Sequence, residues 1–128
     1  MQNTLILILS IAGIAITLYI TLAHILKKKV ICPINSESCN IVLDSKYSRT
    51  FGIKNEIIGL MYYLAIIIAI FIIQSASIIV AVKTASTLAA LYSIILLGIQ
   101  IKKIKNYCSW CITTAIINVI LFALIIKL

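Results

Sequence analysis

The chain has 128 residues, of which 63% are hydrophobic and 11% are charged, and its formal net charge is +8. A soluble domain is only about half apolar, whereas here the apolar residues gather in runs longer than about 18 residues, as in polytopic membrane proteins. The length fits one membrane domain, residues 1–128, without a second soluble domain. Because the lysines lie at the ends of the apolar runs, where they would meet lipid headgroups, we expect no nucleic-acid binding.

The first apolar run, residues 4–26, is long enough to cross a bilayer with some tilt. It has no basic region before it and is longer than the apolar part of a typical signal peptide, so we predict an uncleaved transmembrane helix. His24 lies near the end of this run, where a lone histidine is usually a solvated interfacial residue, and we assign it no function.

The longest polar segment, residues 27–56, contains Cys32, Cys39 and all three acidic residues of the chain. A loop of this length is usually functional or disordered, and its apolar side chains argue against disorder. We therefore predict a cysteine-bearing loop between the first and second membrane helices. Residues 42–48 can form a short amphipathic helix on the membrane, with Phe51 as an anchor.

Three further spans are predicted at residues 57–73, 78–101 and 108–126. The second and third are separated by a turn at residues 74–77 or, alternatively, at residues 83–84. Small side chains are frequent from residue 81 to residue 93, as expected where two helices pack closely. The predicted fold class is thus an all-α membrane protein, a bundle of four transmembrane helices. Four spans bring the polar loop and the start of the last helix, and hence all four cysteines, to one side of the membrane.

Cys108 and Cys111 form a Cys-x-x-Cys motif where a lysine-rich connector turns into the last apolar run. A spacing of three residues places both sulfurs on one face of a helix, and a helix N-terminus stabilises a thiolate. These conditions favour thiol–disulfide exchange, although the same pair can also form a static bridge. Cys111 would lie level with the lipid headgroups, where a lipid-soluble quinone can reach it.

Two kinds of chemistry are open to four cysteines on one surface. A closed Cys₄ zinc site commonly contains a C-x₂-C pair, but Cys32 and Cys39 are spaced C-x₆-C, which is wider than usual and counts against a metal. In a relay, thiolate attack on a disulfide passes electrons from one cysteine pair to the other, and a quinone is the final acceptor. We favour the relay and expect no metal; a non-enzymatic membrane protein with structural disulfides is a further alternative.

Two motifs of the chain resemble the vitamin K epoxide reductase family and its prokaryotic disulfide-forming homologues. The first is Cys39-Asn-Ile-Val-Leu-Asp-Ser-Lys-Tyr, which is followed by Phe51-Gly-Ile and Asn55-Glu-Ile-Ile-Gly. The second is Cys108-Ser-Trp-Cys-Ile-Thr-Thr-Ala-Ile-Ile-Asn118. The resemblance covers roughly residues 32–118, with the two motifs in the order that the family has.

The resemblance implies a role for each matched residue. Cys111 is similar to the cysteine that passes electrons to the quinone, and Cys108 to its disulfide partner. Cys39 is similar to the loop cysteine that attacks Cys108, and Cys32 to the one that exchanges with an external thiol protein. Asn55 is similar to an asparagine that hydrogen-bonds the quinone carbonyl. The remaining matched residues would line the quinone site: Ser45, Phe51, Tyr62 and Tyr63.

The activity that the resemblance implies is oxidation of a thioredoxin-like protein and reduction of a membrane quinone, such as menaquinone or ubiquinone. The net effect would be disulfide formation in other proteins. The chain has no room for the fused thioredoxin-like domain of many prokaryotic members, so we expect a separate partner. Ala115 stands where vertebrate members carry a tyrosine, which removes one hydroxyl donor and makes quinone reduction the simpler implied reaction. The resting disulfides, Cys32–Cys39 with Cys108–Cys111 or the crossed Cys39–Cys108, stay open.

Basic residues are distributed unequally over the two predicted faces of this multi-pass protein of the cell membrane. The cysteine face carries nine of them and the opposite face two. The positive-inside rule therefore favours a cytoplasmic active site, and the outward orientation usual in the family is the alternative. Disulfide formation in the cytosol suits organisms with disulfide-rich intracellular proteins. The nine are Lys27, Lys28, Lys29, Lys46, Arg49, Lys54, Lys102, Lys103 and Lys105, and the two are Lys83 and Lys127.

Overall fold

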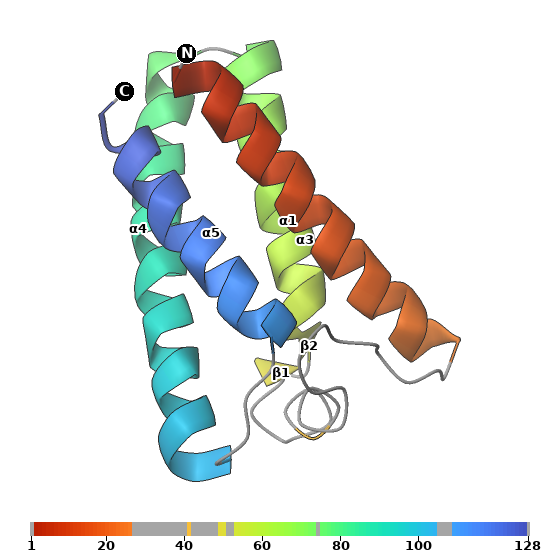
Figure 1. Cartoon of the computed structure of the whole chain (residues 1–128). Coiled ribbons are helices and arrows are strands. Elements are labelled where there is room, and N and C mark those ends of the chain that lie inside the picture. The colour runs from red at the N-terminus through yellow and green to blue at the C-terminus, as the bar shows by residue number, and fades with distance from the viewer. Residues whose placement is uncertain are drawn as a thin grey trace.

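The computed structural model describes residues 2–26, 41, 49–50, 53–73, 75–104 and 109–127, which form long helices and one small hairpin (Figure 1). Two helices, α3 and α4, continue into the π-helical segments η2 and η3. In chain order the elements are α1 (Gln2–Ile25), β1 (Arg49–Thr50), β2 (Ile53–Lys54), α3 (Asn55–Ile67), η2 (Ile68–Ile73), α4 (Ala76–Ile99), η3 (Gln100–Ile104) and α5 (Ser109–Ile125).

Within the described residues, three helical stretches are long and apolar enough to cross a membrane, namely Asn3–Ile25, Asn55–Ile72 and Ala76–Lys103. The fourth helix, α5, is apolar but shorter. Large apolar side chains cover the outside of these helices, for example Ile72 and Leu88, which are 72% and 63% exposed. A surface of this kind is solvated by lipid rather than by water. The predicted helical membrane fold is therefore confirmed, with three helices of spanning length, a shorter fourth helix and two strands of two residues each.

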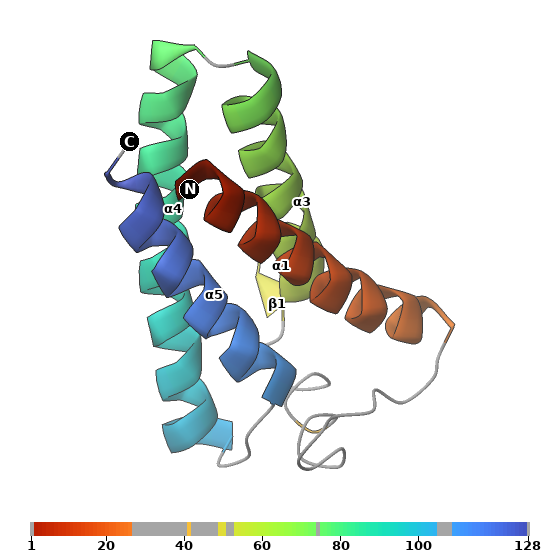
Figure 2. The same cartoon turned by 45° about the horizontal axis from the view of Figure 1, so that its top comes forward.

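The four helices run between two ends of the molecule (Figure 1). Both termini and the connection from α3 to α4 lie at one end, and Figure 2 shows the same arrangement from a second direction. At the other end lie the end of α1, the hairpin, the start of α3, the end of α4 and the start of α5. We call this the hairpin end of the bundle.

The hairpin precedes α3 and was not predicted from the sequence. Arg49 pairs with Lys54 and Thr50 with Ile53 in antiparallel register, and β2 leads directly into α3. Strands of two residues are too short to show a hydrophobic period, so the sequence indicated only a loop. The short helix considered for residues 42–48 lies outside the described residues.

The bounds of the helices fix the position of the turn between the second and third predicted spans. The α4 helix begins at Ala76, after Ser75 in extended conformation. The alternative turn at residues 83–84 is wrong, because these residues lie inside α4. The face of α4 that packs inward carries mostly small side chains, as expected for a close helix contact: Val82, Ser86, Ala90 and Ser93.

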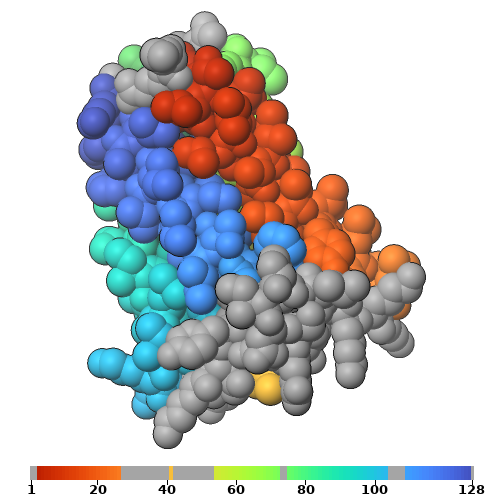
Figure 3. All heavy atoms as spheres, viewed as in Figure 1, coloured from red at the N-terminus to blue at the C-terminus, as the bar shows by residue number. Residues whose placement is uncertain are grey.

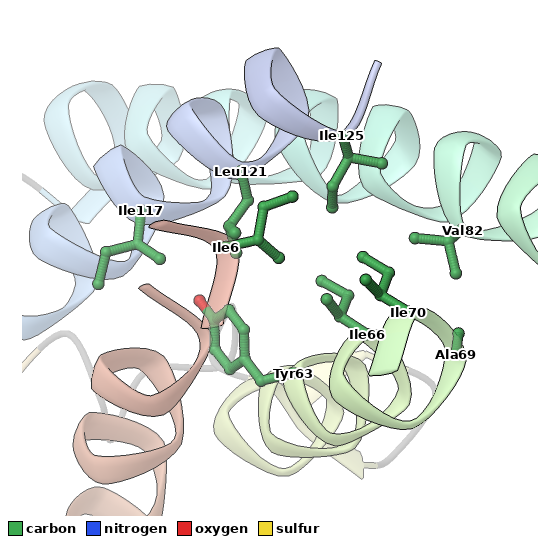
Figure 4. Packing of buried hydrophobic residues seen from close by; sticks show 9 residues of the cluster. All are labelled: Ile6, Tyr63, Ile66, Ala69, Ile70, Val82, Ile117, Leu121 and Ile125. Atoms are coloured by element: carbon green, nitrogen blue, oxygen red, sulfur yellow. The ribbon is translucent and has the colours of Figure 1, made fainter. Parts of the chain in front are cut away.

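The core lies where side chains from all four helices meet (Figure 4). The α1 and α5 helices lie directly against each other on the face seen in Figure 3. In lipid, such packing stabilises the bundle through van der Waals contact, because burial gains little hydrophobic free energy there. The buried cluster contains Ile6, Tyr63, Ile66, Ala69, Ile70, Val82, Ile117, Leu121 and Ile125.

Two glycines allow α1 and α3 to approach each other closely. A Cβ atom at Gly13 of α1 would lie 2.5 Å from Cζ of Tyr63, so the tyrosine ring occupies the space that a side chain would need. One turn further along α1, the methyl group of Thr17 lies 3.3 Å from the Cβ position of Gly59. Small residues of this kind are typical of tight contacts between membrane helices. The contact fixes the Tyr63 ring in the centre of the bundle.

Candidate functional site

A cavity of about 190 Å³ lies between α1, α3, α4 and α5. Most of its lining is apolar, and a few polar side chains converge on it. An apolar cavity of about 150 Å³ is enough to bind benzene. The cavity can therefore hold the ring of an aromatic or quinonoid ligand.

The polar lining at the hairpin end comes from the ends of three helices. Asn55 and Glu56 are the first two residues of α3, and Gln100 is the residue at which α4 becomes η3. Cys111 is the third residue of α5, half-buried, and lines the same cavity. A change from α- to π-helix is frequent at functional sites. The arrangement places a thiol and an amide beside one ring-sized space.

Deeper in the bundle, a hydrogen-bonded chain of side chains joins three helices. The Tyr63 hydroxyl of α3 donates to Oδ1 of Asn118 in α5 over 2.6 Å. Nδ2 of Asn118 donates to Oγ of Ser93 in α4 over 2.7 Å. All three residues line the cavity. The chain pairs polar groups that would be costly in an apolar interior, and it fixes the inner wall of the cavity.

His24 and Glu56 form a hydrogen bond between the end of α1 and the start of α3. Nδ1 of His24 lies 2.5 Å from Oε1 of Glu56, and the two side chains are 13% and 4% exposed. A buried carboxyl group needs such a partner, because an unpaired charge there is strongly unfavourable. The prediction that His24 is a solvated interfacial residue was therefore wrong. Its partner, which also lines the cavity, lies too far away in the sequence to be recognised from local pattern.

Two adjacent tyrosines of α3 line the cavity and differ in their hydrogen bonding. Their ring centroids are 5.4 Å apart, with the ring planes inclined at 48°. The hydroxyl of Tyr63 is bonded to Asn118. The hydroxyl oxygen of Tyr62 is buried and has no hydrogen-bond partner among the residues that the structure describes.

The start of α5 packs against α1 through an aromatic pair. The rings of Trp110 and Tyr19 meet edge to face, with centroids 6.2 Å apart and planes at 70°. Trp110 precedes Cys111, so this contact holds the first turn of α5, which carries the thiol, against the bundle.

Four of the residues singled out from the sequence come together around one cavity: Asn55, Tyr62, Tyr63 and Cys111. The other five lie outside the described residues: Cys32, Cys39, Ser45, Phe51 and Cys108. Within the described part of the chain, no group of three or more His, Cys, Asp or Glu side chains could hold a metal ion.

Several polar residues that line the cavity were not predicted from the sequence to have a role. Asn118 interrupts a long apolar run, and a polar side chain at such a position usually marks a site or a helix contact. Gln100 carries the same signal, since it follows an apolar stretch and is 3% exposed. Ser93 and Glu56 have weaker signals, because serine is common in helix contacts and Glu56 lies at the edge of the polar loop. Each could have been selected as a polar residue inside or beside a predicted span.

Fold and site together define a membrane helical bundle that brings a thiol to an apolar, ring-sized cavity. The sequence matches the vitamin K epoxide reductase family over residues 4–126, which contain the four described helices apart from the first two residues of α1. The chain belongs to this family, and it is accordingly a membrane oxidoreductase. A search of curated proteins finds no match to the chain.

Proposed function

We propose that this protein oxidises a thioredoxin-like partner and reduces a membrane quinone, and so drives disulfide formation in other proteins. The observation that carries the proposal is the position of Cys111 and Asn55 on one ring-sized, largely apolar cavity. A lipid-soluble quinone fits such a space, and its carbonyl oxygens need donors of the amide kind. When bound, the quinone accepts the two electrons that formation of one disulfide releases.

In this proposal Cys111 is the residue that delivers electrons. It lies in the first turn of α5, where the helix N-terminus stabilises the thiolate that must form. The partner cysteine in the motif, Cys108, then closes the disulfide with Cys111. Asn55 holds the quinone carbonyl, and the apolar wall excludes water from the reacting atoms.

The loop residues complete the proposed relay. A reduced thioredoxin-like protein attacks a disulfide that includes Cys32, and Cys39 carries the electrons inward by attacking Cys108. Each step exchanges one thiolate for another and breaks one disulfide as it forms the next. Ser45 and Phe51 are proposed to complete the ring site together with Tyr62 and Tyr63, which line the cavity.

We further propose that the hairpin end faces the cytoplasm. Lys54, Lys102 and Lys103 belong to elements at this end, whereas Lys83 lies in the first third of α4 and Lys127 follows α5, towards the other end. These positions agree with the count of basic residues, which is higher on the face of the cysteines than on the opposite face. In intact cells, a membrane-impermeant maleimide should not label Cys32 after reduction. Rapid labelling from outside would instead establish the outward orientation.

The function can be tested by measuring quinone reduction by the purified protein with two electron donors. With a small dithiol as donor, wild-type protein and Cys32→Ala should both reduce a soluble naphthoquinone, whereas Cys111→Ala should not. With a reduced thioredoxin-like protein as donor, Cys32→Ala should also fail, because the shuttle is interrupted. Thr113→Val is a matched control, since Thr113 is exposed on α5 and bonds only to its own helix backbone in the described contacts. Full activity of Cys111→Ala with the dithiol would contradict the proposal.

A further inference from the structure

The Tyr62 hydroxyl is the feature of the cavity that the architecture of the bundle does not explain. Two buried side-chain oxygens lack a hydrogen-bond partner among the described residues, Oγ of Ser10 and Oη of Tyr62. Ser10 lies in α1 away from the cavity, whereas Tyr62 is part of the cavity lining. A phenol that is buried without a partner is less favourable than the phenylalanine that would fill the same space. An unpaired hydroxyl on a residue that lines a cavity points to a partner from outside the chain, such as a bound ligand.

The Tyr62 side chain lines the cavity, while its hydroxyl oxygen is covered by neighbouring atoms, so a ligand in the cavity meets the hydroxyl only when the ring turns. The neighbouring tyrosine, Tyr63, already donates its proton to Asn118. Ala115 of α5 also lines the cavity and is 5% exposed, but its methyl group offers no donor. Tyr62 thus carries an uncommitted phenolic donor on a side chain that lines the cavity.

The spacing between Asn55 and Tyr62 suits a ligand with two acceptors. The two residues are seven positions apart on α3, which places them on one face and about 10.5 Å apart along the helix axis. The long tyrosine side chain leans back towards the helix N-terminus and shortens that gap. A ring with a carbonyl group at each end can therefore lie along α3 with one oxygen near each donor.

We propose that Tyr62 donates a hydrogen bond to the second carbonyl oxygen of the bound quinone, the one remote from Asn55. Tyr62 is then a specificity residue, which favours a diketone ring over a ring with one carbonyl. This inference rests on the proposed quinone reduction and adds to it the orientation of the ring along α3.

The test compares a soluble naphthoquinone, menadione, with its monoketone analogue 1-tetralone. Binding to purified wild type, Tyr62→Phe and Asn55→Ala is measured in detergent by titration, and the stability of each ligand-free protein is measured by thermal unfolding. Tyr62→Phe should weaken menadione binding about fivefold to a hundredfold, the range expected when one buried hydrogen bond is lost. The monoketone should lose affinity in only one of the two variants, because it has a single oxygen to offer.

The stability of the ligand-free protein separates the two possible roles of the hydroxyl. If the hydroxyl had a structural role, Tyr62→Phe would be less stable than wild type. Without ligand, Tyr62→Phe should be as stable as wild type or more stable, because it removes an unpaired buried polar group. Ser10→Ala is the matched control: it removes the other unpaired hydroxyl and should leave menadione binding unchanged.

Three results would overturn the inference. If wild type and Tyr62→Phe bind menadione equally, the hydroxyl does not contact the quinone, and quinone reduction itself still stands. If Tyr62→Phe is less stable than wild type without ligand, the hydroxyl has a structural partner instead. If wild type binds no quinone, both the inference and the proposed function fail.

Discussion

Replacing Asn118 by leucine should destabilise the bundle, because this residue joins three helices through one side chain. The change removes two hydrogen bonds, of 2.6 Å to Tyr63 and 2.7 Å to Ser93. Leucine has the branched shape and the number of side-chain atoms of asparagine but is apolar, so most of the loss comes from the two partners left behind. These partners are 1% and 8% exposed, and lipid offers them no replacement.

The two former partners of Asn118, Ser93 and Tyr63, should contribute unequally to the loss of stability. The Ser93 hydroxyl can turn to the carbonyl oxygen one turn earlier in its own helix, as serine commonly does. The Tyr63 hydroxyl stands at the end of a rigid ring that is packed against Gly13 and has no such alternative. A buried hydroxyl left unpaired costs about 1–3 kcal/mol, whereas hydrogen bonds between membrane helices average about 0.6 kcal/mol. We expect Asn118→Leu to lower the free energy of unfolding by about 1–2 kcal/mol.

A double-mutant cycle in a mild detergent tests this reasoning. Tyr63→Phe in the Asn118→Leu background should restore part of the lost stability, because replacing both partners by apolar groups is nearly neutral. Val119→Leu, at an exposed position next in the chain, controls for the change of side chain in α5. If the losses in Tyr63→Phe and Asn118→Leu simply add, the two side chains do not interact and the network is refuted.

Three further predictions concern single substitutions. Gly13→Ala places a methyl group 2.5 Å from Tyr63 Cζ and should cost about 1–3 kcal/mol of stability in thermal unfolding, whereas Gly98→Ala, which meets nothing within 4 Å, should cost nothing. Glu56→Gln weakens the contact that ties α1 to α3 and should cost about 1–3 kcal/mol by the same assay; an unchanged unfolding temperature would show that the contact contributes nothing. Asn55→Ala should reduce quinone turnover about fivefold to a hundredfold with less effect on thiol exchange, and an equal loss of both would return this residue to a structural role.

The helices could be predicted from the sequence because a membrane span is defined by its length and its apolar content. The side-chain contacts between the helices could not be predicted in the same way, because the inside and the outside of a helical bundle in lipid are both apolar. The sequence of α5, for example, does not show that Leu121 is buried while Ile120 next to it is 42% exposed. Hydropathy therefore predicts that a helix exists and leaves its orientation in the bundle open.

In the candidate site, the sequence predicted several of the residues but not the hydrogen bonds between them. Cys111, Asn55, Tyr62 and Tyr63 were selected through motifs whose order along the chain is distinctive, and the structure places them around one cavity. The partners of His24 and Asn118 were not found, because they lie 32, 55 and 25 positions away in the sequence. Pairs at such separations come together only through the packing of whole helices, which no local pattern encodes.

The most direct test of the account is a single-turnover measurement without oxygen. The fully reduced protein is mixed with one equivalent of menadione, hydroquinone is followed by absorbance, and the remaining thiols are counted by alkylation and mass spectrometry. We expect that each hydroquinone formed is matched by the loss of two thiols, since formation of one disulfide releases two electrons, and that Cys111→Ala forms no hydroquinone. Unchanged menadione in the presence of the fully reduced wild-type protein, or an equal yield of hydroquinone from Cys111→Ala, would contradict it.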